Sequence, residues 1–156
     1  MAAEVGTKAP DFTIPNQDMQ QVTLSAEVAK QSATVLAFFP AAFSSVCTKE
    51  LCTFRDQMAA LNQLKAQVFG ISVDTFFALK AYATEQGLTF PLLSDFNKDV
   101  IAAYDVVCPD LVGMKGIAKR AVFVIDGTGV IRYKQVLEDA RNEPDYTALT
   151  GAISAL

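Results

Sequence analysis

The chain has 156 residues, of which 51% are hydrophobic, and its net charge is −4. This length fits one domain over residues 1–156, which can bury roughly two-thirds of its unfolded surface. The acidic balance, without a basic cluster, argues against nucleic-acid binding. No apolar run approaches the roughly 20 residues that span a bilayer, so a membrane protein is not expected either.

The N-terminal part of the chain predicts a hairpin followed by a core strand. Residues 11–14 and 21–24 are short β-type segments separated by turn residues. Residues 33–39 are continuously apolar, which is typical of a strand buried on both faces of a sheet. Pro40 ends this strand, because proline supplies no N–H for further pairing.

The middle of the chain predicts helices alternating with a second strand. From position 45 to about 64, apolar residues recur at helical spacing, with Cys47 on the apolar face of the expected helix. Residues 67–73 predict another core strand. Residues 75–86 predict a helix that Gly87 ends, and residues 98–104 a shorter one.

The C-terminal part predicts an antiparallel pair and a last helix. Residues 121–125 and 130–136 flank the turn of residues 126–129, a strong hairpin signal. Residues 144–156 close the chain as a helix. Alternating strands and helices followed by an antiparallel pair indicate an α/β fold with a mixed central sheet flanked by helices. In such sheets the functional site usually lies at the carboxyl ends of the strands.

The chain contains three cysteines and no histidine. Three cysteines are too few for a disulfide framework, and a closed zinc site usually needs four cysteine or histidine ligands. The first residues show neither a basic segment nor an apolar one, so we expect a cytoplasmic protein. In that reducing compartment, the cysteines are structural, catalytic or redox-active.

Cys47 lies at the expected start of a helix, directly after a core strand. Helix-start amides and the helix dipole stabilise a thiolate, which is the reactive form of cysteine. We expect Ser44 to be the N-cap, with its hydroxyl accepting from a helix amide, and Pro40 to wall the site against water. Apolar packing is expected from Phe38, Phe39 and Phe43. Taken alone, however, the position fits a small buried core residue equally well.

A cation is needed to offset the cost of burying a thiolate. The candidates are Lys49, Arg55 and Arg120, and Arg120 is the best placed because it opens a strand expected beside residues 33–39. Glu50 lies on nearly the same helix face as Cys47, where it could orient Arg120. Each of these charges is also common on a solvated surface, so only their joint arrangement indicates a site.

The other cysteines are ambiguous. Five residues along a helix place Cys52 about 7.5 Å beyond Cys47, outside the usual Cα limit of about 7 Å for a disulfide. A bond between them therefore requires the helix start to unwind. Cys108 precedes Pro109 in an expected loop, with no chemical role indicated.

These residues resemble the peroxiredoxin family. Pro40, Ser44 and Cys47 match its Pro-x-x-x-Thr/Ser-x-x-Cys motif, and Arg120 stands where the family has an arginine before a Phe-Val-Ile-Asp strand. The likeness extends over nearly the whole chain, including residues 6–12 and 90–95. It implies a thioredoxin-like fold with an N-terminal β-hairpin extension.

The resemblance also implies a mechanism. Cys47 would attack a hydroperoxide and become a sulfenic acid. Ser44 and the Cys47 amide would hold the peroxide oxygens, while Arg120 would stabilise the charge that develops. Pro40 would shield the product, and Glu50 would position Arg120. No cofactor is implied, because the electrons come from thiols.

The resemblance implies more than one way in which Cys47 could be reduced again. Residues 39–43 are similar to the one-cysteine alkyl hydroperoxide reductase E subgroup, whereas residues 47–52 resemble the bacterioferritin-comigratory, or Q-type, subgroup with its resolving cysteine five positions on. We expect Cys52 to be the resolving cysteine and thioredoxin, or a similar thiol, to be the reductant. Cys108 or an external thiol are alternatives, and both monomers and homodimers occur in the family. The competing functions are a thiol-disulfide oxidoreductase on the same fold and a chaperone-like module without catalysis.

Overall fold

A five-stranded mixed sheet forms the centre of the computed structural model, which describes residues 3–156. The strands run in the order β5-β4-β3-β8-β9; β3, β4 and β5 are parallel, and β8 is antiparallel to both β3 and β9. Their bounds are β3 (Ala33–Phe38), β4 (Ala66–Ser72), β5 (Leu92–Ser94), β8 (Arg120–Asp126) and β9 (Ile131–Leu137).

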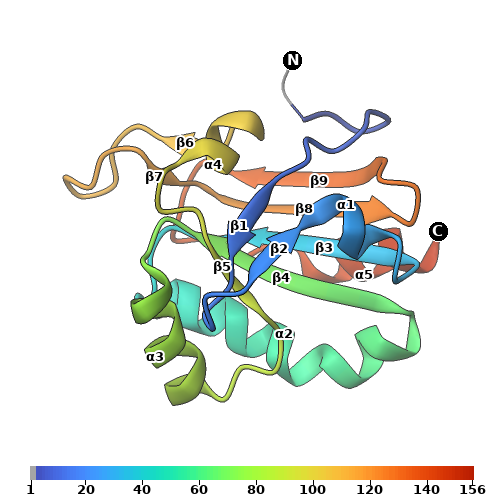
Figure 1. Cartoon of the computed structure of the whole chain (residues 1–156), viewed down its shortest axis with the longest axis horizontal. Helices are drawn as coiled ribbons and strands as arrows, with labels where there is room; N and C mark the ends of the chain where they lie inside the picture. The colour runs from blue at the N-terminus through green and yellow to red at the C-terminus, as the bar shows by residue number, and fades with distance from the viewer. Residues whose placement is uncertain (1–2) are drawn as a thin grey trace.

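Helices cover both faces of this sheet (Figure 1). Side chains of three helices pack on one face: α2 (Ser45–Gln63), α3 (Phe76–Gln86) and α5 (Tyr146–Ser154). The opposite face is covered by two short helices and the N-terminal hairpin: α1 (Leu24–Val28), α4 (Asp99–Ala103), β1 (Thr13–Pro15) and β2 (Gln21–Thr23). A separate two-stranded sheet contains β6 (Val107–Cys108) and β7 (Ile117–Ala118).

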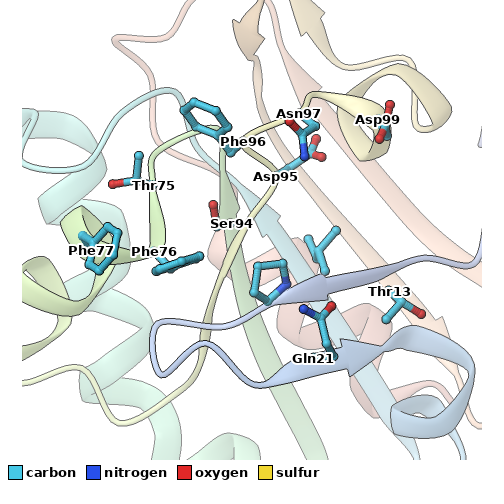
Figure 2. Close-up of a pocket in the computed structure, with 12 residues that line it drawn as sticks. Thr13, Gln21, Thr75, Phe76, Phe77, Ser94, Asp95, Phe96, Asn97 and Asp99 are labelled. Carbon is cyan, nitrogen blue, oxygen red and sulfur yellow. The ribbon is translucent and has the colours of Figure 1, made fainter.

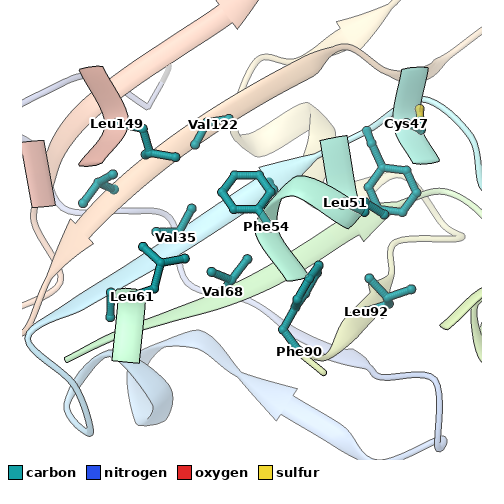
Figure 3. Close-up of a cluster of buried hydrophobic side chains, with 14 of the residues drawn as sticks. Val35, Cys47, Leu51, Phe54, Leu61, Val68, Phe90, Leu92, Val122 and Leu149 are labelled. Carbon is teal, nitrogen blue, oxygen red and sulfur yellow. The ribbon is translucent and has the colours of Figure 1, made fainter. Parts of the chain in front are cut away.

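The central strand β3 serves two cores. All six of its residues are buried, and because side chains alternate along a strand, Val35 and Ala37 join one apolar cluster while Leu36 and Phe38 join the other. Figure 3 shows the first cluster, in which Cys47 lies among the side chains of α2 and the sheet. The expectation that Phe38 packs around Cys47 is therefore wrong, because Phe38 points to the opposite face.

The predicted fold class is confirmed, with the thioredoxin-like sheet, the flanking helices and the N-terminal hairpin all present. The long elements lie within a few residues of their predicted bounds. The sequence did not predict α1, β5, β6 or β7, which have two to five residues each and therefore show no periodicity. Within the described residues, none of the helices is long and apolar enough to cross a membrane.

Candidate active site

Cys47 occupies the first turn of α2, just after the loop that follows β3. Ser44 is the residue before the helix, so Cys47 is the third residue within it, and its side chain is buried. The first N–H groups of a helix have no intrahelical partner and, with the helix dipole, favour a nearby negative charge. The first turn carries no acidic side chain that would oppose this. The helix itself therefore stabilises a thiolate at this position.

Arg120 meets the sulfur from the neighbouring strand. Because β8 is antiparallel to β3, with Phe38 opposite Ala121, the start of β8 lies at the same edge of the sheet as the end of β3. The Nη2 atom of Arg120 donates to Cys47 Sγ at 3.3 Å, and its Nη1 donates to Glu50 Oε1 at 2.7 Å. The Ala140 carbonyl accepts from both Nε and Nη2 of the guanidinium. Arg120 is thus locked in place from three directions.

The other two candidate cations are engaged elsewhere. Lys49 is exposed and pairs with Glu143. Arg55 pairs with Asp56 and donates to the Gln86 carbonyl at the end of α3. The structure thus brings Arg120, but not Lys49 or Arg55, into hydrogen-bond contact with Cys47.

Ser44 takes the predicted N-cap position, but its side chain does not cap the helix. Its hydroxyl donates to the Ala41 carbonyl at 2.9 Å, and it accepts from no helix amide. The amides of the first turn are therefore left for another acceptor. Pro40 is buried at the end of β3, as expected of a residue that walls the site, whereas Phe43 is half exposed.

Glu50 is fully buried, and its two carboxylate oxygens differ. Oε1 accepts from Arg120, whereas Oε2 has no hydrogen-bond partner within the described part of the chain. Burial raises the pKa of Glu50 to about 7, although the charge and hydrogen bond of Arg120 pull it in the other direction. Burial by itself would lower the pKa of Arg120, but negative charge on Cys47 and Glu50 raises it, so the guanidinium stays charged.

Replacing Glu50 with glutamine should remove one pH dependence of stability. The pKa of Glu50 rises from 4.5 to about 7 on folding, so native Glu50 holds its proton more tightly. The stability that this proton contributes is fully present below pH 4.5 and is lost as the pH rises through about 7. Relative to Glu50→Gln, the wild type should lose up to about 3 kcal/mol over this interval. Urea unfolding of both reduced proteins measures the difference, and a difference independent of pH would contradict the assignment.

Cys52 and Cys108 are free and lie in different surroundings. Cys52 is on the same unbroken helix as Cys47, and its Sγ contacts Gln86 Oε1 at 3.6 Å, facing α3. Cys108 is not in a loop, as the sequence predicted, but in β6. It lines a cavity of about 290 Å³ whose wall also includes Pro40 and Arg120, so this thiol lies closer to the site than expected.

Several contacts at the site were not predicted from the sequence. The contact of Arg120 with the Ala140 carbonyl is one of them. In addition, the Thr48 hydroxyl lies 2.9 Å from the Tyr82 hydroxyl, and the ring centroids of Phe43 and Tyr82 are 4.8 Å apart. Asp74 accepts from the Ala42 backbone N–H at 2.8 Å. For Asp74 the sequence does hold a signal, since it directly follows a core strand at the carboxyl edge of the sheet.

A second cavity lies away from these thiols. Figure 2 shows it between the N-terminal hairpin, the start of α3 and the segment after β5, with a volume of about 550 Å³. Aromatic and polar side chains line it, and none of the three cysteines is among its lining residues. This cavity is therefore separate from the candidate site around Cys47.

The comparisons with known proteins identify the family of the chain. A family model described as the AhpC/TSA family matches residues 5–134. Alkyl hydroperoxide reductase E of Mycobacterium tuberculosis is 36% identical over 155 residues, which cover 97% of this chain and 98% of that protein. The crystal structure of peroxidoxin BcpB from Mycobacterium tuberculosis superposes with a TM-score of 0.87 at 29% identity, covering 98% of this chain and 97% of that one. The crystal structure of a peroxiredoxin-like protein from Aquifex aeolicus superposes with a TM-score of 0.88 at 27% identity, covering 99% of this chain and 88% of that one. The chain therefore belongs to the AhpC/TSA family and is a peroxiredoxin, a thiol-dependent peroxidase.

Proposed function

We propose that Cys47 is the peroxidatic cysteine, acting on hydrogen peroxide and organic hydroperoxides within a single domain of residues 1–156. Its thiolate attacks the terminal peroxide oxygen, so that an S–O bond forms as the O–O bond breaks. The leaving oxygen takes up a proton and departs as water or an alcohol, and Cys47 becomes a sulfenic acid. The observation that carries this proposal is the 3.3 Å contact between Arg120 and the buried sulfur.

The neighbouring groups fit the roles that the sequence indicates. The Ser44 hydroxyl donates to Ala41, which leaves its oxygen lone pairs to accept from the hydroperoxide. The Cys47 amide can donate to the peroxide oxygen, and Arg120 stabilises the negative charge that develops there. Glu50 orients Arg120 through the 2.7 Å contact, and Pro40, which has no N–H, shields the sulfenic acid.

We propose Cys52 as the resolving cysteine. Its thiolate attacks the sulfur of the sulfenic acid; an S–S bond forms, the S–O bond breaks, and the oxygen leaves as water after protonation. Thioredoxin or a similar dithiol then reduces the disulfide by exchange. The first turns of α2 must unwind for this step, and helix ends are where local opening costs least.

Replacing Cys52 with serine should separate the two half-reactions. One round of peroxide reduction is expected to remain, because Cys47 and Arg120 are untouched, whereas recycling by thioredoxin should slow by at least about tenfold. Stopped-flow measurement of the first turnover and a coupled NADPH assay of the steady state measure the two rates. Cys108→Ser is the matched control, and its rates of first turnover and of recycling by thioredoxin should both equal those of the wild type. If Cys52→Ser recycles normally, while Cys108→Ser does not, Cys108 is the resolving cysteine.

The activity itself is tested by combining the protein with hydrogen peroxide, thioredoxin, thioredoxin reductase and NADPH. Peroxide-dependent oxidation of NADPH is expected. Thiols that stay intact, with no consumption of NADPH, would favour a non-catalytic module, and disulfide reduction without peroxide reduction would favour a thiol-disulfide oxidoreductase. We further propose that the enzyme works in the cytoplasm, as a monomer or a homodimer, which light scattering after gel filtration distinguishes.

A further inference from the structure

One carboxylate ties the loop between β3 and α2 to the rest of the molecule. Asp74 Oδ2 accepts from the Ala42 backbone N–H at 2.8 Å and from the Ser72 hydroxyl at 2.7 Å. Among residues 3–156, the Ala42–Asp74 contact is the one hydrogen bond that joins residues 40–44 to a partner more than four positions away in the chain. The loop before Cys47 therefore depends on Asp74 for its polar attachment.

Asp74 is itself firmly held. Its backbone N–H donates to the Ser72 hydroxyl at 3.2 Å, and its carbonyl accepts from the Ser94 hydroxyl at 2.6 Å. Ser72 and Ser94 are buried at the carboxyl ends of the neighbouring strands β4 and β5. Figure 2 labels Ser94, the last residue of β5. Asp74 is thus an anchor fixed to the sheet, and the loop is the part that can move.

The loop has a backbone that needs such an anchor. Phe43 has a φ of 69°, in the left-handed region that non-glycine residues rarely adopt. Its side chain is half exposed, and its aromatic contact is with the Tyr82 ring of α3. Without the Asp74 contact, relaxation of Phe43 would shift Ser44 and the start of α2, and with them the first-turn amides beside Cys47.

We propose that Asp74 is a positioning residue that latches this loop in the conformation for peroxide reduction, and that release of the latch favours the unwound helix start in which Cys47 reaches Cys52. This inference rests on the proposed function. Latched, Cys47 faces Arg120 and reacts with peroxide. Released, it leaves that contact and approaches Cys52. Asp74 therefore sets the balance between the two half-reactions.

The same latch controls damage by excess peroxide. A sulfenic acid that stays in the peroxide site can react with a second hydroperoxide, giving a sulfinic acid and an alcohol or water. Disulfide formation competes with this reaction. A hydrogen bond to a charged acceptor is strong enough to change a local opening equilibrium by about tenfold or more. Removing it should therefore protect Cys47 from over-oxidation while slowing its first reaction.

The test uses Asp74→Ala and, as the matched variant that keeps an acceptor oxygen, Asp74→Asn. In the Cys52→Ser background, Asp74→Ala should slow formation of the sulfenic acid by about tenfold, measured by stopped-flow fluorescence or rapid quench with dimedone trapping. With Cys52 present, it should speed disulfide formation after one equivalent of peroxide and lower the sulfinic fraction at excess peroxide. Asp74→Asn should lie between Asp74→Ala and the wild type in all three measurements.

Amide hydrogen exchange of the reduced proteins gives a readout that does not depend on activity. Asp74→Ala should raise exchange in residues 40–52 and leave the central sheet unchanged. Uniformly faster exchange, or oxidation and disulfide formation slowed by the same factor, would mean a general structural role and overturn the proposal. Unchanged rates and unchanged exchange would overturn it as well. If the wild type formed no sulfenic acid, the proposed function would fail instead, and exchange in residues 40–52 would still decide whether Asp74 holds the loop.

Discussion

Replacing Cys47 with serine is expected to reduce peroxide turnover by more than about a thousandfold. Serine fits the buried site, but its hydroxyl keeps its proton at neutral pH, even beside Arg120 and the start of α2, so no anionic nucleophile forms. The coupled NADPH assay should show no peroxide-dependent rate above background. Dimedone labelling of the oxidised protein should also disappear at this position.

The control for this experiment is Cys108→Ser, which removes a partly buried thiol and leaves the Arg120 contact with Cys47 intact. It should retain the wild-type rate of sulfenic acid formation, while Cys47→Ser retains the thermal stability of a folded protein. A Cys47→Ser variant that still reduced peroxide would show that another thiol is the nucleophile. If Cys108→Ser lost activity at the same time, the nucleophile would be Cys108.

The second large effect is expected from Arg120→Met. The guanidinium is the charged group that donates to Cys47 Sγ, and removing a donor of this kind commonly costs about a hundredfold to a thousandfold in rate. Methionine keeps much of the side-chain volume but supplies neither charge nor hydrogen bond. The second-order rate constant for oxidation by hydrogen peroxide, measured by stopped flow, should fall within that range.

Arg120→Met also removes the partner of a buried carboxylate. Breaking a buried ion pair by deleting one partner can cost about 3–5 kcal/mol, although protonation of Glu50 limits the loss. The double variant Arg120→Met with Glu50→Gln removes both charges, so it should regain stability in urea unfolding without regaining the oxidation rate. If the double variant recovered the rate, Arg120 would act only by keeping the protein folded.

The long elements were predictable because each buries several residues in a regular pattern. The continuously apolar β3 and the helical spacing in α2 are examples, and together they placed Cys47 at a helix start. Short elements were not predictable. For example, β5 has three residues and forms because Gly70, Ile71 and Ser72 of β4 offer it a partner. Such pairing depends on strands that the local sequence does not show.

The features of the candidate site likewise fall into those that the sequence could predict and those that it could not. Pro40, Cys47 and Arg120 carry their chemistry in the residue type, so their joint arrangement and the resemblance to the family motif were enough to select them as candidates. The direction of the Ser44 hydroxyl and the carbonyl of Ala140 carry no such signal. Any residue supplies a carbonyl, and a hydroxyl turns toward whichever acceptor the folded loop presents.

By itself, then, the sequence determined the order of the main elements, because this follows from periodicity, and it singled out Cys47 as the candidate reactive group. The family followed from the resemblance of the motif formed by Pro40, Ser44 and Cys47. Only the tertiary structure decided which charges meet. It placed Arg120 against a sulfur 73 positions away, left one oxygen of Glu50 without a hydrogen-bond partner among residues 3–156, and joined Ala42 to Asp74. These contacts follow from strand register and close packing, in which displacements of about an ångström make or break a hydrogen bond.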